Sequence, residues 1–294
     1  MSPRVRRLRH CVALPALLAA FAAVIPARGH AGDRLLGTGG LMQLEGAAGG
    51  GLTPWALIAG LGTRDQVGLS TFCTRVRPRN YELDACGAAI GVHDRIELAV
   101  AQQSFDVSAV SPGESLRQRI LGVKLRVLGD AIFGAHAWLP QLSLGAQLKR
   151  NRDFDLIPAG AGARDDDGVD LYVAATKVWL FGIAGRTTLF NGVVRATRAN
   201  QFGLLGFGGD RRERYSLVPE SSVAVFVHDK LAIGGEYRAK PDNLGVFTEH
   251  DAWDAFVAMF PTKHYSLTAA YTDLGSIAGL RSQTGWYVSL QATF

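Results

Sequence analysis

The chain is poor in charge and lacks the common catalytic signatures. Charged residues make up 19% of its 294 residues, and no long run of like charge occurs, whereas globular proteins average about 25%. There is no His-Glu zinc motif, no Walker motif and no nucleophile elbow. The glycine clusters at 37–40, 49–51 and 203–209 are not followed by a helical pattern, so a phosphate-binding turn is not indicated. We therefore expect no enzyme activity, no cofactor and no metal site.

An acidic stretch comes nearest to a metal motif. Residues 165–170 contain four Asp, three of them contiguous. A calcium-binding loop spaces its acidic ligands alternately instead. We interpret this stretch as a solvated acidic loop.

Long apolar runs are also scarce. After residue 31 no apolar stretch reaches the ~18 residues of a membrane-spanning helix. The one long run, residues 12–25, follows four arginines and precedes small residues that end at Ala31. This is the order of a secretory signal peptide. We predict that residues 1–31 are cleaved (with Ala27 as the alternative site) and that residues 32–294 form a single domain.

The predicted cleavage changes the charge balance. The whole chain has a formal net charge of +5, but residues 1–31 hold five arginines and no acidic residue. The rest of the chain therefore has 26 basic and 26 acidic residues. The basic surface expected of a nucleic-acid-binding protein is absent.

Cysteine is nearly absent too, with three residues in the chain, and Cys11 lies in the predicted signal. Cys73 and Cys86 flank a turn at residues 78–80 and would lie opposite each other in a symmetric hairpin. Exported proteins fold in an oxidising compartment. We predict a Cys73–Cys86 disulfide, the alternative being two free thiols.

What the chain does have is alternation of apolar and polar residues. Segments such as 265–272 and 286–294 place an apolar residue at every second position, which indicates strands. They run for about 9–12 residues, the length that crosses a bilayer and longer than a soluble strand. Short turns also alternate with long loops, as in outer-membrane barrels. We predict an all-β transmembrane antiparallel up-and-down β-barrel of about fourteen strands, or twelve if residues 38–60 form a plug or one weak segment is a loop.

The C-terminal segment favours the membrane barrel over a periplasmic sandwich. An alternating strand with an aromatic last residue resembles the terminal strand that the barrel-assembly machinery recognises. Its apolar positions are Trp286, Val288, Leu290, Ala292 and Phe294. We predict export through the periplasm to the outer membrane of a Gram-negative cell, with outer-membrane lipid as a partner.

The other face of the predicted strands carries charge. A charge at membrane depth must face water or a partner, so the lumen is expected to be polar. The residues predicted to line it are Glu97, Lys124, Arg126, Lys149, Lys177, Arg195, Glu236, Arg238 and Asp254. Their basic excess over residues 117–198 favours a mild preference for anions, unless the charges neutralise one another in a closed lumen.

The N-terminal part of the mature chain carries a family resemblance. Residues 35–66 include the glycine-rich run Glu45 to Leu52 and the segment Pro54 to Gly60. Together with residues 95–105, 236–244 and the Phe294 ending, they resemble the family catalogued as domain of unknown function 3034. The resemblance implies an outer-membrane-type barrel and brings no reaction, ligand or catalytic residue.

Three functions remain open at this point. The preferred one is a porin-like channel for small polar or anionic solutes. The second is a closed structural or interaction barrel that uses its long outer loops, and the third is a lipid-modifying enzyme. An open lumen would favour the channel, and a plugged lumen the closed barrel.

Overall fold

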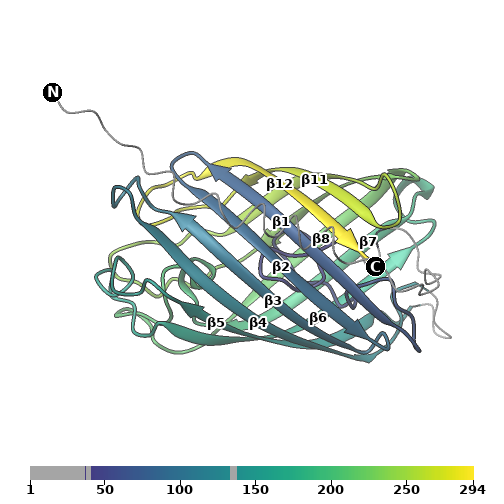
Figure 1. Ribbon diagram of the computed structural model, residues 1–294, viewed down its shortest axis with the longest axis horizontal. Helices are drawn as coiled ribbons and strands as arrows, with labels where there is room; N and C mark the ends of the chain where they lie inside the picture. The colour runs from purple at the N-terminus through teal and green to yellow at the C-terminus, as the bar shows by residue number, and fades with distance from the viewer. Residues whose placement is uncertain (1–36, 38–40, 133–137) are drawn as a thin grey trace. The chain divides into compact units, whose positions relative to one another are not determined.

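The computed structural model describes residues 37, 41–132 and 138–294, so the predicted signal peptide lies outside the described residues. The described chain forms a closed barrel in which each strand pairs with its neighbours in sequence and β1 pairs with β12 (Figure 1). All strand pairs are antiparallel. The strands are β1 Val67–Pro78, β2 Glu82–Val92, β3 Ile96–Asp106, β4 Ser115–Leu128, β5 Gln141–Asn151, β6 Asp167–Trp179, β7 Thr188–Thr197, β8 Ser216–His228, β9 Leu231–Arg238, β10 Ala252–Met259, β11 Tyr265–Asp273 and β12 Thr284–Thr293.

The described part of the chain has little helix. Two short 3-10 turns, η1 Ile183–Gly185 and η2 Asn200–Gly203, interrupt the loops on either side of β7. Within the described ranges, no helix is long and apolar enough to cross a membrane.

The two ends of the barrel differ in their connections. One end carries the connections 107–114, 152–166, 198–215, 239–251 and 274–283, together with the tight turn at 79–81. We call this the long-loop end. The opposite, short-turn end includes the brief turns 93–95 and 229–230 and the end of the chain beside the start of β1. The predicted alternation of turns and loops is therefore present in most of the connections, but 129–140 at the short-turn end is longer than 107–114 at the long-loop end, and 180–187 is as long as it.

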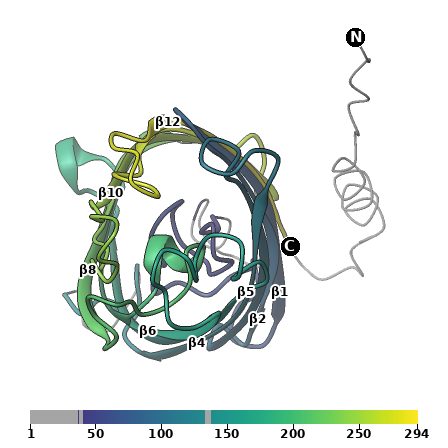
Figure 2. The same ribbon diagram turned by 90° about the vertical axis from the view of Figure 1, so that its left-hand side faces the viewer.

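The barrel has twelve strands, the smaller of the two predicted counts, because residues 41–61 lie inside it as a plug. Figure 2 shows this segment within the ring of strands. The plug folds back on itself through backbone hydrogen bonds, such as Gln43 N–H to Ala47 O at 2.8 Å and Trp55 N–H to Ala48 O at 3.0 Å. The expected additional strand pair over residues 38–60 is thus absent from the described residues 41–60.

Glycine makes the plug fit. Gly46 has φ +94°, a left-handed conformation that favours glycine. A Cβ on Gly50 would lie 2.0 Å from the Glu236 carboxylate, and one on Gly51 would lie 2.4 Å from the Tyr287 hydroxyl. The glycine-rich run therefore forms tight internal turns that approach the wall more closely than larger residues allow.

The wall has an apolar outer face and a mainly polar or small-residue inner face. Large apolar side chains are exposed at alternate positions, for example Leu121 at 57% and Leu148 at 52%. Aromatic rings lie near both ends of this surface: Trp253, Tyr271 and Trp286 form a row at the long-loop end, and Trp179 packs edge-on to Phe190 at the other. An apolar band between aromatic girdles is what a bilayer requires of a spanning barrel.

Candidate functional site in the barrel lumen

Six buried charged residues hold the first half of the plug. They are Glu45 of the plug and Lys149, Asp170, Arg195, Glu220 and Arg238 of the wall, which we call the Glu45 cluster. Glu45 lies 2.5 Å from the Lys149 ammonium, 3.0 Å from the Arg238 guanidinium and 3.7 Å from that of Arg195. With three acids and three bases, the cluster is neutral only while Glu45 is in place.

The wall residues of this cluster also pair with one another. Asp170 lies 2.7 Å from Lys149 and 3.3 Å from Arg195, and Glu220 pairs with both Arg195 and Arg238. Burial alone would raise the pKa of Glu45, but the charges of Arg238, Lys149 and Arg195 outweigh it and hold this pKa below its usual range. Glu45 therefore stays ionised inside the barrel.

A second charged pair clamps the middle of the plug. Glu97 on β3 and Lys124 on β4 lie opposite each other and pair at 3.0 Å, both 1% exposed. Glu97 accepts hydrogen bonds from the Ala48 and Ala59 amides, at 3.1 and 2.9 Å. Lys124 donates to the carbonyls of Ala48 and Leu57, at 3.1 and 2.8 Å. Here the plug contributes backbone groups but no charge.

The tip of the plug is held by further hydrogen bonds. Glu236 accepts from the Leu52 amide and the Thr53 hydroxyl, both at 2.7 Å, and the Trp55 indole donates to Ser222 at 2.8 Å. Thr176 accepts from the Ala56 amide at 2.7 Å. Buried polar groups of the plug thus find partners from several strands of the wall.

Loops close the long-loop end. The η2 turn lies within the ring of strands (Figure 2), where the Phe202 ring stacks under the Arg238 guanidinium at 4.2 Å. Buried Lys240 pairs with Glu249 at 2.9 Å and donates to Gln201 Oε1 at 2.8 Å and Leu274 O at 2.9 Å. One lysine therefore ties three long loops together.

Small cavities lie between the described wall and plug. Two cavities there have volumes of about 10 and 30 Å³. A single water needs roughly 10–15 Å³ by this kind of measure. These two cavities offer room for isolated waters rather than for a solute.

Most of the predicted lumen charges lie inside the barrel. Glu97, Lys124, Lys149, Arg195 and Arg238 contact the plug directly, as does Glu236. Asp254 is 3% exposed and lies opposite Glu236 across β9 and β10. Arg126 points inward at the short-turn end, where it pairs with Asp94 and, at 3.1 Å, with Asp130.

Lys177 does not line the lumen, contrary to the prediction. Its neighbours Thr176 and Val178 face inward, so Lys177 faces outward, opposite Phe190 of β7. Its ammonium donates to the carbonyls of Asp130 and Leu139, at 3.3 and 3.4 Å. The side chain is buried because the β4–β5 connection covers it, and it contributes no charge to the lumen.

The sequence reasoning missed three members of the Glu45 cluster: Glu45, Asp170 and Glu220. Asp170 was interpreted as part of a solvated loop, yet it is 1% exposed. Its alternation with inward-facing Tyr172 and Ala174 on β6 was a signal that could have identified it. Over residues 117–198 the expected basic excess remains, with four inward bases against Asp170. Over all the strands, however, the inner face carries five acids and five bases: Glu97, Asp170, Glu220, Glu236 and Asp254 balance Lys124, Arg126, Lys149, Arg195 and Arg238.

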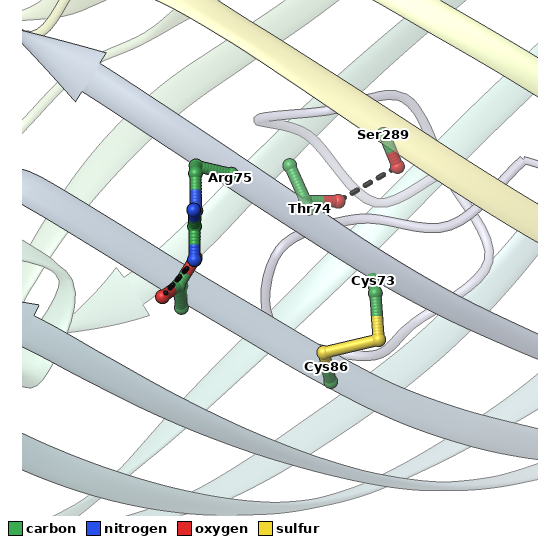
Figure 3. Close-up of a disulfide and its surroundings, with 6 residues drawn as sticks. Cys73, Thr74, Arg75, Cys86 and Ser289 are labelled. Atoms are coloured by element: carbon green, nitrogen blue, oxygen red, sulfur yellow. Dashed lines mark hydrogen bonds and ion pairs between the residues drawn. A yellow bond between two sulfur atoms is a disulfide. The ribbon is translucent and has the colours of Figure 1, made fainter. Parts of the chain in front are cut away.

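Cys73 and Cys86 form a disulfide between β1 and β2, where the two residues are in direct register (Figure 3). Both belong to the outward-facing set of their strands, whereas the adjacent Thr74 points inward and donates to Ser289 at 2.7 Å. The bridge therefore lies on the opposite side of the wall from the plug.

The C-terminal strand closes the barrel. Trp286, Val288 and Leu290 are exposed on the outer face, whereas Ala292, of the same set, is covered. The Phe294 ring stacks on His264, and the Phe294 carbonyl accepts hydrogen bonds from Leu61 and Leu69. The end of the plug and the two closing strands thus meet at Phe294.

Residues 38–291 match the family described as "Protein of unknown function (DUF3034)". The chain belongs to this family. The match covers the plug and nearly all of the barrel. Among the described residues no group of three or more His, Cys, Asp or Glu is arranged to hold a metal ion.

Comparison with curated proteins gives no match. Among solved structures, the KdgM and NanC porins each have 8% identity and a TM-score of 0.47, with 77% of this chain covered and 99% and 98% of theirs. Outer membrane phospholipase A from Escherichia coli has 10% identity and a TM-score of 0.40, with 78% and 92% covered. Sequence identities and TM-scores this low carry no information about a substrate or an activity.

Proposed function

We propose that this protein is an outer-membrane channel for small polar solutes that is closed at rest and opens when the plug, residues 41–61, leaves its seat. The long-loop end would face the cell exterior, as in other barrels of this type. The proposal includes export by the predicted signal peptide and insertion by the barrel-assembly machinery.

The observation that carries the proposal is the polar seat of the plug. The wall holds the plug through the ion pairs of Glu45. It also holds the plug through hydrogen bonds with Glu97, Lys124, Thr176, Ser222 and Glu236. Water can satisfy each of these groups once the plug moves, whereas an apolar seat would resist hydration. Because the wall charges on the strands balance, we expect weak ion selectivity rather than a preference for anions.

A second candidate is a permanently closed barrel whose long loops bind an outside partner. The plugged lumen itself favours this candidate, and so do the Lys240 contacts, because they tie three of the long loops into one surface. The two candidates differ in whether the plug ever leaves the lumen.

A reversible lock on the plug distinguishes them. The Thr53 and Ser222 hydroxyl oxygens are 3.3 Å apart, so Thr53→Cys with Ser222→Cys can bridge plug and wall. We expect brief single-channel openings in wild type that disappear when the new bridge is oxidised and return on reduction. The wild type under the same reductant controls for the Cys73–Cys86 bridge. Openings that persist in the locked barrel, or a wild type that never opens, would contradict the gated channel.

A further inference from the structure

Four arginines form a block on the outer face of the barrel at the long-loop end. Arg117 and Arg119 belong to the outward-facing set of β4, and Arg150 to that of β5. Arg119 lies directly opposite Arg150, and the backbone amide of the fourth, Arg152, donates to the Arg117 carbonyl at 2.8 Å. Like charges directly opposite on one face of a sheet repel each other.

Nearby carboxylates neutralise only half of this block. Asp153 binds Arg117 in a bidentate arrangement, at 2.6 and 2.9 Å, and Asp166 lies 3.2 Å from Arg150. Within the described ranges, the guanidinium groups of Arg119 and Arg152 have no hydrogen-bond or ion-pair partner. Two guanidinium groups of the block are therefore outside any close ion pair, although Arg152 interacts with Asp153 at longer range.

The block borders both the apolar band and an open cavity. Leu121 and Leu148 face each other one step further along the same outer face, each more than half exposed. On the loop side, a cavity of about 670 Å³ is lined by Arg119, Arg150 and Arg152, and also by Arg164. Of the carboxylates that line it, Asp165 is paired with Arg198 and Asp166 with Arg150. Asp155 is the remaining acid.

The β1–β2 hairpin shows a different solution at the same end of the barrel. Its outward-facing Arg75 and Arg77 each face a carboxylate on β2: Arg75 binds Asp84 at 2.6 Å, and Arg77 binds Glu82 at 2.9 Å. This hairpin needs no outside counter-charge. Arginines without a close ion pair are therefore found at the long-loop end of β4 and β5 but not on the β1–β2 hairpin.

We propose that Arg119, Arg150 and Arg152 bind the phosphate of an anionic lipid in the outer leaflet. The apolar band would hold the acyl chains while the guanidinium groups bind phosphate oxygens above it. Guanidinium binds phosphate through paired hydrogen bonds, and basic residues beside a membrane-spanning segment attract anionic headgroups. This site depends on the outer face of the barrel and not on the proposed gating.

Native mass spectrometry of the purified full-length protein in a neutral detergent tests the site, with lipid A as the phosphorylated probe. The variant Arg119→Gln/Arg150→Gln/Arg152→Gln is compared with the matched control Arg75→Gln/Arg77→Gln. We expect wild type and control to bind lipid A alike, and the triple variant to bind at least roughly tenfold more weakly. Arg119→Lys should retain part of the affinity that Arg119→Gln loses.

Several results would overturn the proposal. Binding by the triple variant within twofold of wild type would do so, as would equal weakening of both variants, which would indicate general surface charge. Equal binding of lipid A stripped of its phosphates would indicate an apolar contact. Full competition by millimolar inorganic phosphate would indicate a site for a free anion. Should the triple variant fail to fold, as judged by its heat-modifiable migration, Arg119→Gln alone replaces it.

Discussion

Two charged sites hold the plug in different ways. In the Glu45 cluster the plug contributes a charge, and the wall without it has three bases against two acids. In the Glu97–Lys124 pair both charges belong to the wall, and the plug contributes only backbone groups. Removing the plug would therefore unbalance the first site and leave the second neutral. The position of the plug should depend most on Glu45.

The largest expected effect follows from Glu45→Gln. It leaves a net positive charge in a buried cluster, and breaking a buried ion pair from one side costs about 3–5 kcal/mol. The opening free energy of the plug should fall by about that amount, as measured by hydrogen exchange of peptides covering residues 41–61. Glu82→Gln, which removes an exposed carboxylate from the outer face, should change it by less than about 0.5 kcal/mol. Equal effects of the two variants would contradict the role of Glu45.

A double-mutant cycle sharpens the comparison at the second site. Glu97→Gln and Lys124→Met each leave one buried charge unpaired, so each should weaken the plug by roughly 3 kcal/mol. The double variant should cost less than the two singles together, with a coupling of about 0.5–3 kcal/mol. The same hydrogen-exchange measurement applies. Strict additivity would show that the pair does not act as a unit.

A neutral anchor should matter less than either charged site. Thr53→Val keeps the volume of the side chain but removes the hydroxyl that donates to Glu236. We expect the opening free energy to fall by about 1 kcal/mol. The matched control is Thr71→Val, because the Thr71 hydroxyl has no hydrogen-bond partner within the described ranges. A loss as large as that for Glu45→Gln would remove the distinction between charged and neutral anchors.

Mild acid should have a smaller effect still. The pKa of Glu45 in the folded barrel is lowered from its ordinary 4.5, so its stabilising contribution is complete above that pH and is lost as pH falls below it. Plug opening measured from pH 7 down to about pH 5 should change little through Glu45, and should increase at lower pH. The Glu45→Gln variant should lose this acid-dependent part. An acid response of equal size in both proteins would assign it to another group.

Reducing the Cys73–Cys86 disulfide should leave the plug unaffected. The bridge lies on the outer face between two strands that their own hydrogen bonds already hold in register. We expect the hydrogen exchange of residues 41–61 to be the same before and after reduction. Faster exchange after reduction would show that the closing hairpin and the plug are coupled.

Much of the barrel could be predicted because its physics is local to each strand. The alternation of apolar and polar residues along β11 and β12 predicts which side chains face lipid. Cys73 and Cys86 are equally far from the turn between them, and this symmetry predicts that they lie opposite each other. Lys177 shows the limit of this reasoning. A charged residue on a strand can be buried on the outer face when a loop covers it there, as the β4–β5 connection covers Lys177. The sequence alone does not predict where a loop will lie.

The sequence allowed a plug as one of two alternatives, but it did not predict which wall residues the plug contacts. Residues 41–61 were compatible with a strand pair as well as with a plug, since neither glycine nor short apolar runs decide between them. The ion-pair partners of Glu45 come from β5, β7 and β9, and the other two members of its cluster come from β6 and β8. Such long-range neighbours are set by barrel closure, and no local pattern in one sequence contains them.

The central claim is that residues 41–61 close the lumen and that Glu45 holds them there. Single-channel recordings of wild type and Glu45→Gln in the same planar bilayer test it most directly. We predict that wild type is closed with brief, rare steps, and that Glu45→Gln shows steps of the same size with a much larger open fraction. A steady open conductance in wild type, unchanged by Glu45→Gln, would contradict the account.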